Sequence, residues 1–519
     1  MPLLGSLLKR TMALKKRLDN MNETLDKLHL RRDALSRQRR SLKKLLVKAQ
    51  YTEFGKHFRF DAILLSNDII QNFQKTVPTY DYDLIYDKWW HRTMNGEPNI
   101  CWPGKIKFFA LSSGTSGASS KCIPVTNDGL KSIKRTSIKQ LGALAYCDLP
   151  ENFLEKGFLM VGGSTELKRN AIGYEGDLSG ITTGNLPYWF QRFYKPGSEI
   201  SRERDWNTKI EKMVQNAPDW DIFIIAGVPS WIQILFEKII EHYQVTDIHK
   251  IWPNLSIYVH GGVAFEPYKK AFDALIGKPL IYLNTYLASE GFVAYQTRPE
   301  YEGMRLTIND GNFYEFVPFN ERNFDEEGQL RDKPQIYRID EVERGIDYAL
   351  LISTRSGAWR YLIGDTIQFV NLERCEIKLT GRTKQFLSLC GEHISIDNLT
   401  KASQLAADEM NISIPEFTVC GVAFQGLFAH HWYIGTNDVV DADVLKLKLD
   451  RHLKALNDDY AVERTSALKE IIVEVLPVHI FYDYLQKIGR IGSQNKFPRV
   501  MKGEKMKSWI KFVENTSEV

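Results

Sequence analysis

Short apolar runs that alternate with helical patterns are the feature that most constrains the fold. The runs Phe158–Val161 and Ile222–Ala226 have the length of buried strands, and a helical pattern over Ser230–Tyr243 follows the second run. Leu255–Val259 and Leu280–Leu283 have the same strand character. Because strands that alternate with helices pack as an α/β sheet, this part of the chain is predicted to have an α/β fold.

Two regions follow in which strands are predicted in closer succession. The first has strand patterns at 304–319, 336–340, 348–354, 366–370 and 376–379. The second is predicted to contain strands Phe417–Phe424, His431–Thr436 and Glu470–Leu476 and helices Ala442–Asn457 and Phe481–Lys487. At 519 residues the chain is too long for one core. Two or three domains are therefore expected, and the second region has about the size of a separate α+β domain.

The N-terminal segment is strongly basic. Residues 1–50 hold 14 Lys and Arg against 4 Asp and Glu, so they carry +10 while the rest of the chain carries −6. Neither Gly nor Pro occurs between Ser6 and Phe54, which predicts a long helix or a helical hairpin. Polar residues interrupt its leucine row, which favours packing against the main domain over a coiled coil. A solvated helix surface is favoured over an acidic-membrane contact, and without interleaved aromatic residues no nucleic-acid partner is expected.

The cellular compartment is inferred from three features: apolar run length, the N-terminal segment and the cysteine pattern. No apolar run is long enough to span a bilayer, so no transmembrane segment is expected. Met1–Leu18 is basic but has only paired leucines and no small-residue cleavage pattern, so it is interpreted as part of a helix and not as a targeting peptide. The six cysteines form no CxxC pair or Cys/His cluster, which argues against a zinc site and a disulfide framework. This pattern fits a reducing, cytoplasmic compartment.

A loop rich in hydroxyl side chains and glycine lies between two predicted strands, Phe108–Leu111 and Cys122–Val125. Its hydroxyl groups can donate to phosphate oxygens, its glycines can present backbone N–H groups to an anion, and its lysine adds a positive charge. The residues concerned are Ser112, Ser113, Gly114, Thr115, Ser116, Gly117 and Lys121. Their order does not match the P-loop, which must also open a helix. The loop is either an ordinary turn or a phosphate-binding loop, and Thr126 or Asn127 is predicted to cap the helix that follows.

Four stretches, in this order, resemble one family: Leu111–Lys121, Tyr286–Gly291 (YLASEG), Arg360–Asp365 (RYLIGD) and Gly492–Arg499 (GSQNKFPR). Together they are similar to the Gretchen Hagen-type auxin-responsive-promoter family of acyl-acid amido synthetases, a branch of the adenylate-forming (acyl-activating) superfamily. The resemblance covers nearly the whole chain. It implies a large N-terminal α/β adenylation domain over residues 1–380, a small mobile C-terminal α+β domain over residues 381–519 and a hinge near Thr380–Lys384.

The resemblance also implies a two-step reaction that uses ATP and Mg²⁺. A carboxylate attacks the α-phosphorus of ATP to give an acyl-adenylate and pyrophosphate. An amine, usually an amino acid, then displaces AMP to form an amide. A small-molecule carboxylic acid and an amine are therefore the partners that the resemblance implies.

Individual residues receive implied roles from the same resemblance. Tyr286 would lie against adenine, Asp365 would accept both ribose hydroxyls, and Glu290 would hold Mg²⁺. Lys496 would be the catalytic residue, because its charge could stabilise the negative charge that builds on the α-phosphate and the attacking carboxylate. The implied nucleotide-binding set is Ser112, Ser113, Gly114, Thr115, Ser116, Lys121, Tyr286, Ser289, Asp365 and Arg382.

The chain also departs from the plant members of this family. Leu287 and Ala288 replace a Gly and a Ser, and Cys390–His393 (CGEH) resembles the bacterial pattern, which indicates a bacterial-type member. Leu362 stands where many members have Arg, which removes one potential contact to an anion. Plant hormones are therefore not the expected substrates.

The acyl pocket is expected between Val161 and Tyr194 and around His260–Ala264. Leu186, Tyr188 and Trp189 favour an aromatic or aliphatic acid. His260 itself has two open interpretations, a residue that faces this pocket or a core histidine.

Three functions are open on the sequence alone. The first is an amido synthetase, and the second is a ligase that transfers the acyl group to coenzyme A or a carrier thiol after the same first step. The third is a non-catalytic nucleotide-binding or scaffolding protein, against which the presence of Lys496, Glu290 and Asp365 counts. The acid, the acceptor and the oligomeric state are not indicated.

Overall fold

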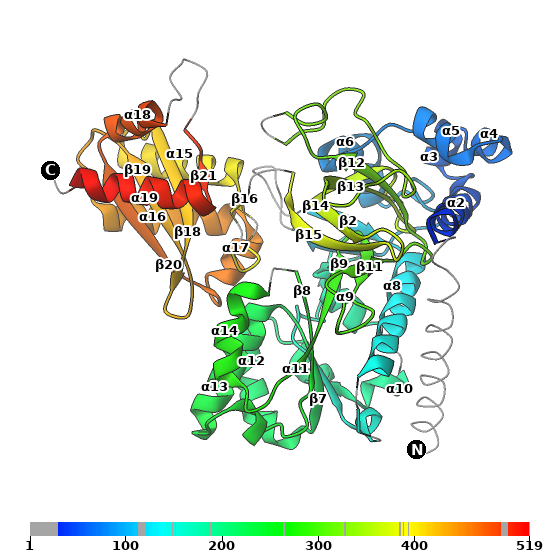
Figure 1. Ribbon diagram of the computed structural model, residues 1–519, viewed down its shortest axis with the longest axis horizontal. Helices are drawn as coiled ribbons and strands as arrows, with labels where there is room; N and C mark the ends of the chain where they lie inside the picture. The colour runs from blue at the N-terminus through cyan, green and yellow to red at the C-terminus, as the bar shows by residue number, and fades with distance from the viewer. Residues whose placement is uncertain are drawn as a thin grey trace. The chain divides into compact units, whose positions relative to one another are not determined.

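The computed structural model (Figure 1) describes residues 30–112, 121–147, 149–150, 152–186, 188–262, 265–325, 328–383, 386–387, 389–392, 394–488 and 497–517. The chain divides into two compact units: unit 1 comprises Met1–Leu111 and Cys122–Thr383, and unit 2 comprises Ser112–Lys121 and Lys384–Val519. The division follows β15 (Glu376–Arg382), whereas the sequence analysis placed a domain boundary after residue 380. Strand β15 pairs with β14 from Glu376 to Arg382 and with β11 at Glu376 and Ile377, and the pairing with β14 holds its last residues in the sheet of unit 1.

The described part of unit 1 is built on a mixed sheet with the strand order β12-β13-β14-β15-β11-β10-β9-β8-β7-β3-β6. Strands β6, β3, β7, β8 and β9 are parallel, and the remaining pairs are antiparallel. The strands are β3 Gly157–Met160, β6 Tyr194–Lys195, β7 Ile222–Ala226, β8 Ile257–Gly261, β9 Ile281–Ala288, β10 Gly291–Tyr295, β11 Met304–Leu306, β12 Phe313–Pro318, β13 Asp347–Ser353 and β14 Tyr361–Asn371, with β15 as given. The predicted α/β fold is confirmed.

The parallel strands are connected through helices, as their geometry requires. Helices α12 (Trp206–Asn216), α13 (Pro229–Tyr243) and α14 (Glu266–Leu275) lie on one side of β7 and β8, and α8 (Asn127–Gln140) lies on the other (Figure 1). Thr126 caps α8 as predicted, because its hydroxyl oxygen accepts the Gly129 N–H at 2.8 Å. This arrangement covers both faces of strands rich in Ile and Val.

The N-terminal helices cover the antiparallel half of unit 1. They are α2 Leu30–Ala49, α3 Glu53–His57, α4 Phe60–Leu65, α5 Ile69–Thr76, α6 Tyr82–Ile85 and α7 His91–Met94, with a π-helical turn at Tyr86–Trp90. Gln38, one of the polar residues that interrupt the leucine row, is buried: its side chain donates to the Ile308 carbonyl at 2.9 Å and accepts from the Tyr314 N–H at 2.7 Å. These bonds fix α2 to β12, so the predicted packing against the main domain is confirmed for residues 30–49, whereas residues 1–29 lie outside the described residues.

Strands β1 (Phe108–Ser112) and β2 (Lys121–Val125) pair in a small sheet of order β2-β1-β5-β4, with β4 Lys168–Arg169 and β5 Tyr174–Gly176. The two strands predicted on either side of the Gly/Ser-rich loop are therefore confirmed. Residues 113–120 of that loop lie outside the described residues.

The strand predicted at 336–340 does not form. Tyr337 makes a single bridge to Phe316, with both backbone N–H groups donating across it at 3.0 and 2.8 Å. The next N–H, that of Arg338, donates to the Glu341 carboxylate at 2.8 Å, which turns the chain away from the sheet. The Glu341 N–H also donates to the Arg338 carbonyl at 3.0 Å, so residues 338–341 form a turn and the ladder ends after one rung.

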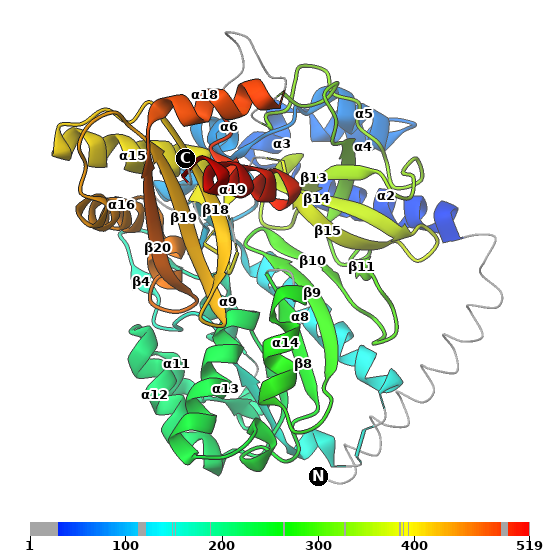
Figure 2. The ribbon, with the colours of Figure 1, turned by 60° about the vertical axis from the view of Figure 1, so that its left-hand side comes forward.

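Unit 2 has a four-stranded sheet of order β20-β19-β18-β21, and Figure 2 shows the first three strands side by side. The strands are β18 Glu416–Phe424, β19 Leu427–Gly435, β20 Leu468–Leu476 and β21 Val500–Met501, and the helices are α15 Ile396–Met410, α16 Ala442–Leu456, α17 Asp458–Glu463, α18 Val478–Lys487 and α19 Gly503–Ser517. Aromatic residues of α18 and α19, including Phe481, Tyr484 and Trp509, form a core cluster with Tyr433 of β19. The predicted α+β composition of this unit is confirmed.

Two further findings concern the described residues. All six cysteines are free thiols, and four of them are buried. None of the described helices combines the length and the apolar character that crossing a membrane requires.

Candidate functional site

The carboxyl ends of parallel strands β8 and β9 meet at one edge of the large sheet, which is where α/β sheets commonly bind ligands. Tyr286 lies near the end of β9, and Ser289 and Glu290 form the turn between β9 and β10. Gly261 ends β8, and a Cβ atom there would lie 2.2 Å from the Thr285 carbonyl oxygen. A side chain at this position would therefore push the two strand ends apart.

Asp365, Tyr286 and Arg382 are brought together in unit 1. The Tyr286 hydroxyl donates to Asp365 Oδ2, and Arg382 Nε lies 2.8 Å from Asp365 Oδ1. Asp365 and Arg382 are also paired across β14 and β15. Burial raises the pKa of Tyr286 well above its ordinary value, and the negative charge of Asp365 raises it further. The tyrosine is thus a neutral donor that holds the carboxylate in one orientation.

The contact between Tyr286 and Asp365 was not foreseen from the sequence. The tyrosine is only 5 % exposed, and its ring belongs to the core of unit 1. The predicted contact of its ring face with adenine stays a prediction. Among the described residues, Tyr286 donates to Oδ2 of Asp365 and Arg382 to Oδ1, and a carboxylate oxygen can accept more than one hydrogen bond. The carboxylate therefore keeps capacity for an additional donor.

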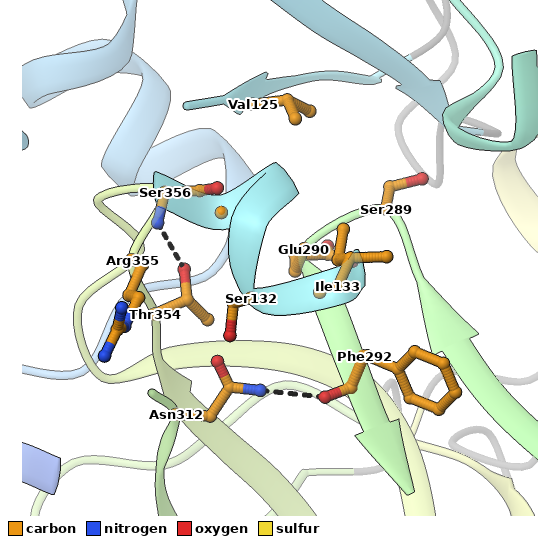
Figure 3. A pocket seen from close by; sticks show the side chains of 12 residues that line it. Val125, Ser132, Ile133, Ser289, Glu290, Phe292, Asn312, Thr354, Arg355 and Ser356 are labelled. Atoms are coloured by element: carbon orange, nitrogen blue, oxygen red, sulfur yellow. Dashed lines mark hydrogen bonds between the residues drawn. The ribbon is translucent and has the colours of Figure 1, made fainter. Parts of the chain in front are cut away.

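Glu290 is 9 % exposed and lines a cavity of about 10 Å³, enough for one water molecule. Figure 3 shows Glu290 at this cavity with Ser132, Ser289 and Asn312 among the other lining residues. The cavity is much too small for a nucleotide. It is therefore a water-sized space beside Glu290 and not a nucleotide pocket.

Tyr361 is a second buried tyrosine beside a site carboxylate. It is 1 % exposed, and burial raises its pKa well above the ordinary value. The charge of Glu290 and a side-chain hydrogen bond with it raise this pKa further. Glu290 and Asp365 thus each have a buried tyrosine partner, and the sequence analysis gave no role to Tyr361.

Arg360, which precedes Tyr361, forms a buried ion pair. Its guanidinium donates to both carboxylate oxygens of Glu315, with distances of 3.0 to 3.2 Å, and to the backbone carbonyls of Gln74 and Val77 at 2.8 and 2.6 Å. Arg360 adopts a left-handed backbone with φ +43°. These contacts tie the start of β14, which carries Asp365, to β12 and to the end of α5.

Other predicted positions lie in apolar surroundings. Leu362 packs with Val317, Ala349 and Leu351 in a separate small core, so the residue that replaces the family Arg points into the protein interior. His260 is 6 % exposed and stacks on Phe265 with ring centroids 4.8 Å apart. Of the expected acyl-pocket residues, Leu186 is partly buried, and the side chains of Tyr188 and Trp189 lie outside the described residues.

Some predicted site residues cannot be placed. Ser113, Gly114, Thr115, Ser116 and Lys496 lie outside the described residues, as does the side chain of Ser112. Lys121 is described as the partly buried first residue of β2. The structure therefore brings together Tyr286, Asp365 and Arg382, with Ser289 and Glu290 in the adjoining turn.

In unit 2 the CGEH stretch contains a buried acid. Glu392 accepts the backbone N–H groups of Leu389 and Cys390 at 2.9 Å, and its Oε1 lies 2.9 Å from Nε2 of the buried His430. These bonds hold the chain that follows the division between the units against β19. The sequence analysis assigned no partner to Glu392, because its partner lies 38 residues away.

Acid is expected to destabilise unit 2 through Glu392. Burial opposes ionisation, but the hydrogen bond and charge of the His430 ring and the backbone N–H donors hold the pKa at about 2, below the ordinary 4.5. A carboxyl group with a lowered folded pKa stabilises the fold above its unfolded pKa, and this stabilisation is lost as the pH falls through the folded pKa. The thermal midpoint should therefore fall more steeply between pH 4.5 and pH 2 in the wild type than in Glu392→Gln. Parallel curves would contradict this assignment.

Comparisons with known proteins identify the family to which the chain is similar. Residues 26–210, 306–382 and 397–505 match the GH3 family N-terminal, central and C-terminal domains. The chain is similar to indole-3-acetic acid-amido synthetase GH3.8 of Oryza sativa subsp. indica, at 24 % identity over 49 % of this chain and 44 % of that protein. It is also similar to indole-3-acetic acid-amido synthetase GH3.15 of Arabidopsis thaliana, at 23 % identity over 70 % of this chain and 72 % of that protein. The matched stretch spans less than half the length of several such relatives.

Solved structures show the same fold. The AtGH3.15 acyl acid amido synthetase in complex with 2,4-DB superposes with a TM-score of 0.56 at 19 % identity and covers 94 % of this chain and 95 % of its own. A 2-hydroxyisobutyryl-CoA ligase superposes with a TM-score of 0.56 at 12 % identity over 93 % of this chain and 92 % of its own. With its three domains matched in order along most of the sequence, the chain belongs to the GH3 family.

Proposed function

We propose that the protein is an acyl-acid amido synthetase. In the first step a carboxylate oxygen of the acid attacks the α-phosphorus of ATP, and the bond to the β-phosphate oxygen breaks, which gives an acyl-adenylate and pyrophosphate. In the second step an amine nitrogen attacks the acyl carbon and AMP leaves, while the amine proton is lost to solvent. The observation that carries the proposal is the cluster of Tyr286, Asp365 and Arg382 beside the Glu290 turn, in a chain of the GH3 family.

We infer residue roles from the family resemblance, and the cluster supports the roles of Tyr286, Asp365 and Arg382. Asp365 would accept the ribose hydroxyls, and Arg382 would bind the ribose or the α-phosphate from the adjacent strand. Tyr286 would contact adenine and orient Asp365. The loop Ser112–Lys121 would hold the leaving phosphates, and Lys496 would stabilise the charge that builds on the α-phosphate in the first step.

Glu290 offers a carboxylate that suits Mg²⁺. Ser132, Ser289 and Asn312, whose side chains carry neutral oxygen atoms, line the same small cavity. Mg²⁺ favours one or two carboxylates together with substrate phosphates and water. Glu290 would hold the ion, which when bound neutralises negative charge on the phosphates.

The two units would have separate tasks. We infer that the larger unit binds ATP and the acid, and that the smaller unit carries Lys496 and moves between the two steps about a hinge near Thr380–Lys384. The division of the chain between Thr383 and Lys384 supports this position for the hinge.

The substrates would be a small carboxylic acid and an amino acid. Relatives named indole-3-acetic acid-amido synthetase and jasmonoyl–L-amino acid synthetase support this class. The decisive experiment is carboxylate-dependent ATP–pyrophosphate exchange with a panel of aromatic and aliphatic acids. Mass spectrometry would then identify the product formed with amino acids or with coenzyme A. An amide supports the proposal, a thioester replaces it with a thiol ligase, and absence of exchange across the panel despite ATP binding contradicts it.

Replacing Asp365 with alanine should weaken ATP binding by about 10–100-fold, because the hydrogen bonds of a charged group to two hydroxyls are lost. Titration calorimetry with ATP measures this change. The control is Asp61→Ala, which removes an exposed carboxylate on α4 and should leave ATP affinity unchanged. Unchanged affinity in Asp365→Ala would contradict the ribose role.

A further inference from the structure

The chain that directly follows Lys496 is unusually well anchored in unit 2. Phe497 is 2 % exposed, and its ring packs edge-on against Phe481 of α18 at 4.8 Å and against Trp509 of α19 at 5.0 Å between centroids. A large aromatic side chain in such a core contributes strongly to local order. The residue after Lys496 is therefore fixed by packing.

Arg499 provides a second anchor, through its side chain. Its Nη1 donates to Glu416 Oε2 at 2.8 Å and to the Phe417 carbonyl at 3.2 Å, and its Nη2 donates to the Pro415 carbonyl at 3.4 Å. The guanidinium also lies over the Phe417 ring, 4.6 Å from the centroid. A planar guanidinium can satisfy a carboxylate, a carbonyl and an aromatic face at once, which a lysine cannot do.

The backbone provides a third anchor at the same place. The Arg499 carbonyl accepts the Val419 N–H at 3.0 Å, and β21 then pairs in parallel with β18, with Val500 opposite Val419. Fixing a backbone residue costs conformational entropy. Side-chain packing, an ion pair and a strand pairing here offset that cost within a few residues of Lys496.

We propose that Arg499, held by Glu416 and Phe417, is a positioning residue for Lys496. The proposal rests on the proposed function, in which Lys496 acts in acyl-adenylate formation. The ion pair sets the register of residues 497–501 against the start of β18 and so fixes one end of the segment that carries the lysine. Positioning matters because a displacement of about 1 Å can lower a rate by about 100-fold.

This inference predicts an effect confined to the first step. Arg499→Gln and Glu416→Gln should each lower pyrophosphate exchange by about 10–100-fold, with the KM for ATP changed by less than about threefold. Amide formation from a chemically prepared acyl-adenylate of the acid found by exchange should stay within about twofold, because in the proposed function Lys496 acts in the first step and the smaller unit moves between the two steps. Arg499→Lys should recover only part of the exchange rate, since it keeps the charge and loses the fork geometry.

The matched control is Arg451→Gln, which breaks another Arg–Glu pair of unit 2, that of Arg451 and Glu409, on an exposed helix surface. In this variant the rates of pyrophosphate exchange and of amide formation should both be unchanged. Thermal midpoints of all variants identify any that fail to fold, and Glu416→Gln tests the same contact from the other partner.

A double-mutant cycle with Lys496→Ala tests whether Arg499 acts through the lysine. If Arg499 acts through Lys496, Arg499→Gln should cause no further loss of exchange in the Lys496→Ala background. Equal losses in both backgrounds, equal losses in both steps, or normal exchange in Arg499→Gln would each overturn the inference. Normal exchange in Lys496→Ala alone would overturn the lysine assignment and with it this inference, and absence of exchange in the wild type would overturn the proposed function itself.

Discussion

Lys496→Ala is expected to lower carboxylate-dependent ATP–pyrophosphate exchange by about 10²–10³-fold, the loss typical of removing one group that stabilises transition-state charge. ATP affinity should change by less than about threefold, because the contact forms mainly as negative charge builds on the α-phosphate and the attacking carboxylate. Exchange measured with labelled pyrophosphate and binding measured by calorimetry separate the two effects.

The control for this variant is Lys511→Ala, an exposed lysine of α19 in the same unit. Its exchange rate and ATP affinity should match those of the wild type. Near-normal exchange by Lys496→Ala would refute the assignment, and an equal loss in Lys511→Ala would show that the assay reports general damage to unit 2.

Arg360→Met is expected to have the largest effect on stability. It leaves the carboxylate of Glu315, which is 1 % exposed, without its cation in the core of unit 1. Removing one partner of a buried ion pair typically costs about 3–5 kcal/mol. The urea midpoint of unit 1, followed by tryptophan fluorescence, should fall accordingly. Replacing both partners with apolar residues should recover much of the loss, because no buried charge then lacks a partner.

A matched control exists for the backbone conformation of Arg360. Arg59 also has a left-handed backbone, with φ +51° against +43° for Arg360, but its ion pair with Asp61 is exposed. Exposed pairs contribute little to stability. Arg59→Met should therefore leave the urea midpoint nearly unchanged. Similar midpoints for Arg59→Met and Arg360→Met would contradict the role of the buried pair.

Much of the local structure could be predicted from sequence because it depends on local patterns. The strands on either side of the Gly/Ser-rich loop, the Thr126 cap of α8 and the strand–helix alternation from β7 to α13 all follow from periodicity and capping chemistry within a few residues. The strand expected at 336–340 is reduced to one bridge because Glu341 closes a turn on Arg338 through its backbone N–H and its carboxylate, and hydrophobic periodicity does not predict such a turn.

The order of the four stretches determined the family, and the family domains matched along the chain confirm it. The roles that the resemblance implies for Glu290, Asp365 and Lys496 stay predictions for the experiments above.

Only the tertiary structure decided which side chains meet. The Tyr286 hydroxyl donates to Asp365, 79 residues away, and Arg360 donates to Glu315 and to the Gln74 carbonyl, 45 and 286 residues away. Arg499 likewise meets Glu416 at a separation of 83 residues. These partners depend on strand order and register, which arise from packing the whole sheet, whereas a sequence pattern specifies only which face each residue takes. The sequence thus determined the elements and the family, and the packed sheets decided the charge pairs that orient Asp365 and anchor the segment after Lys496.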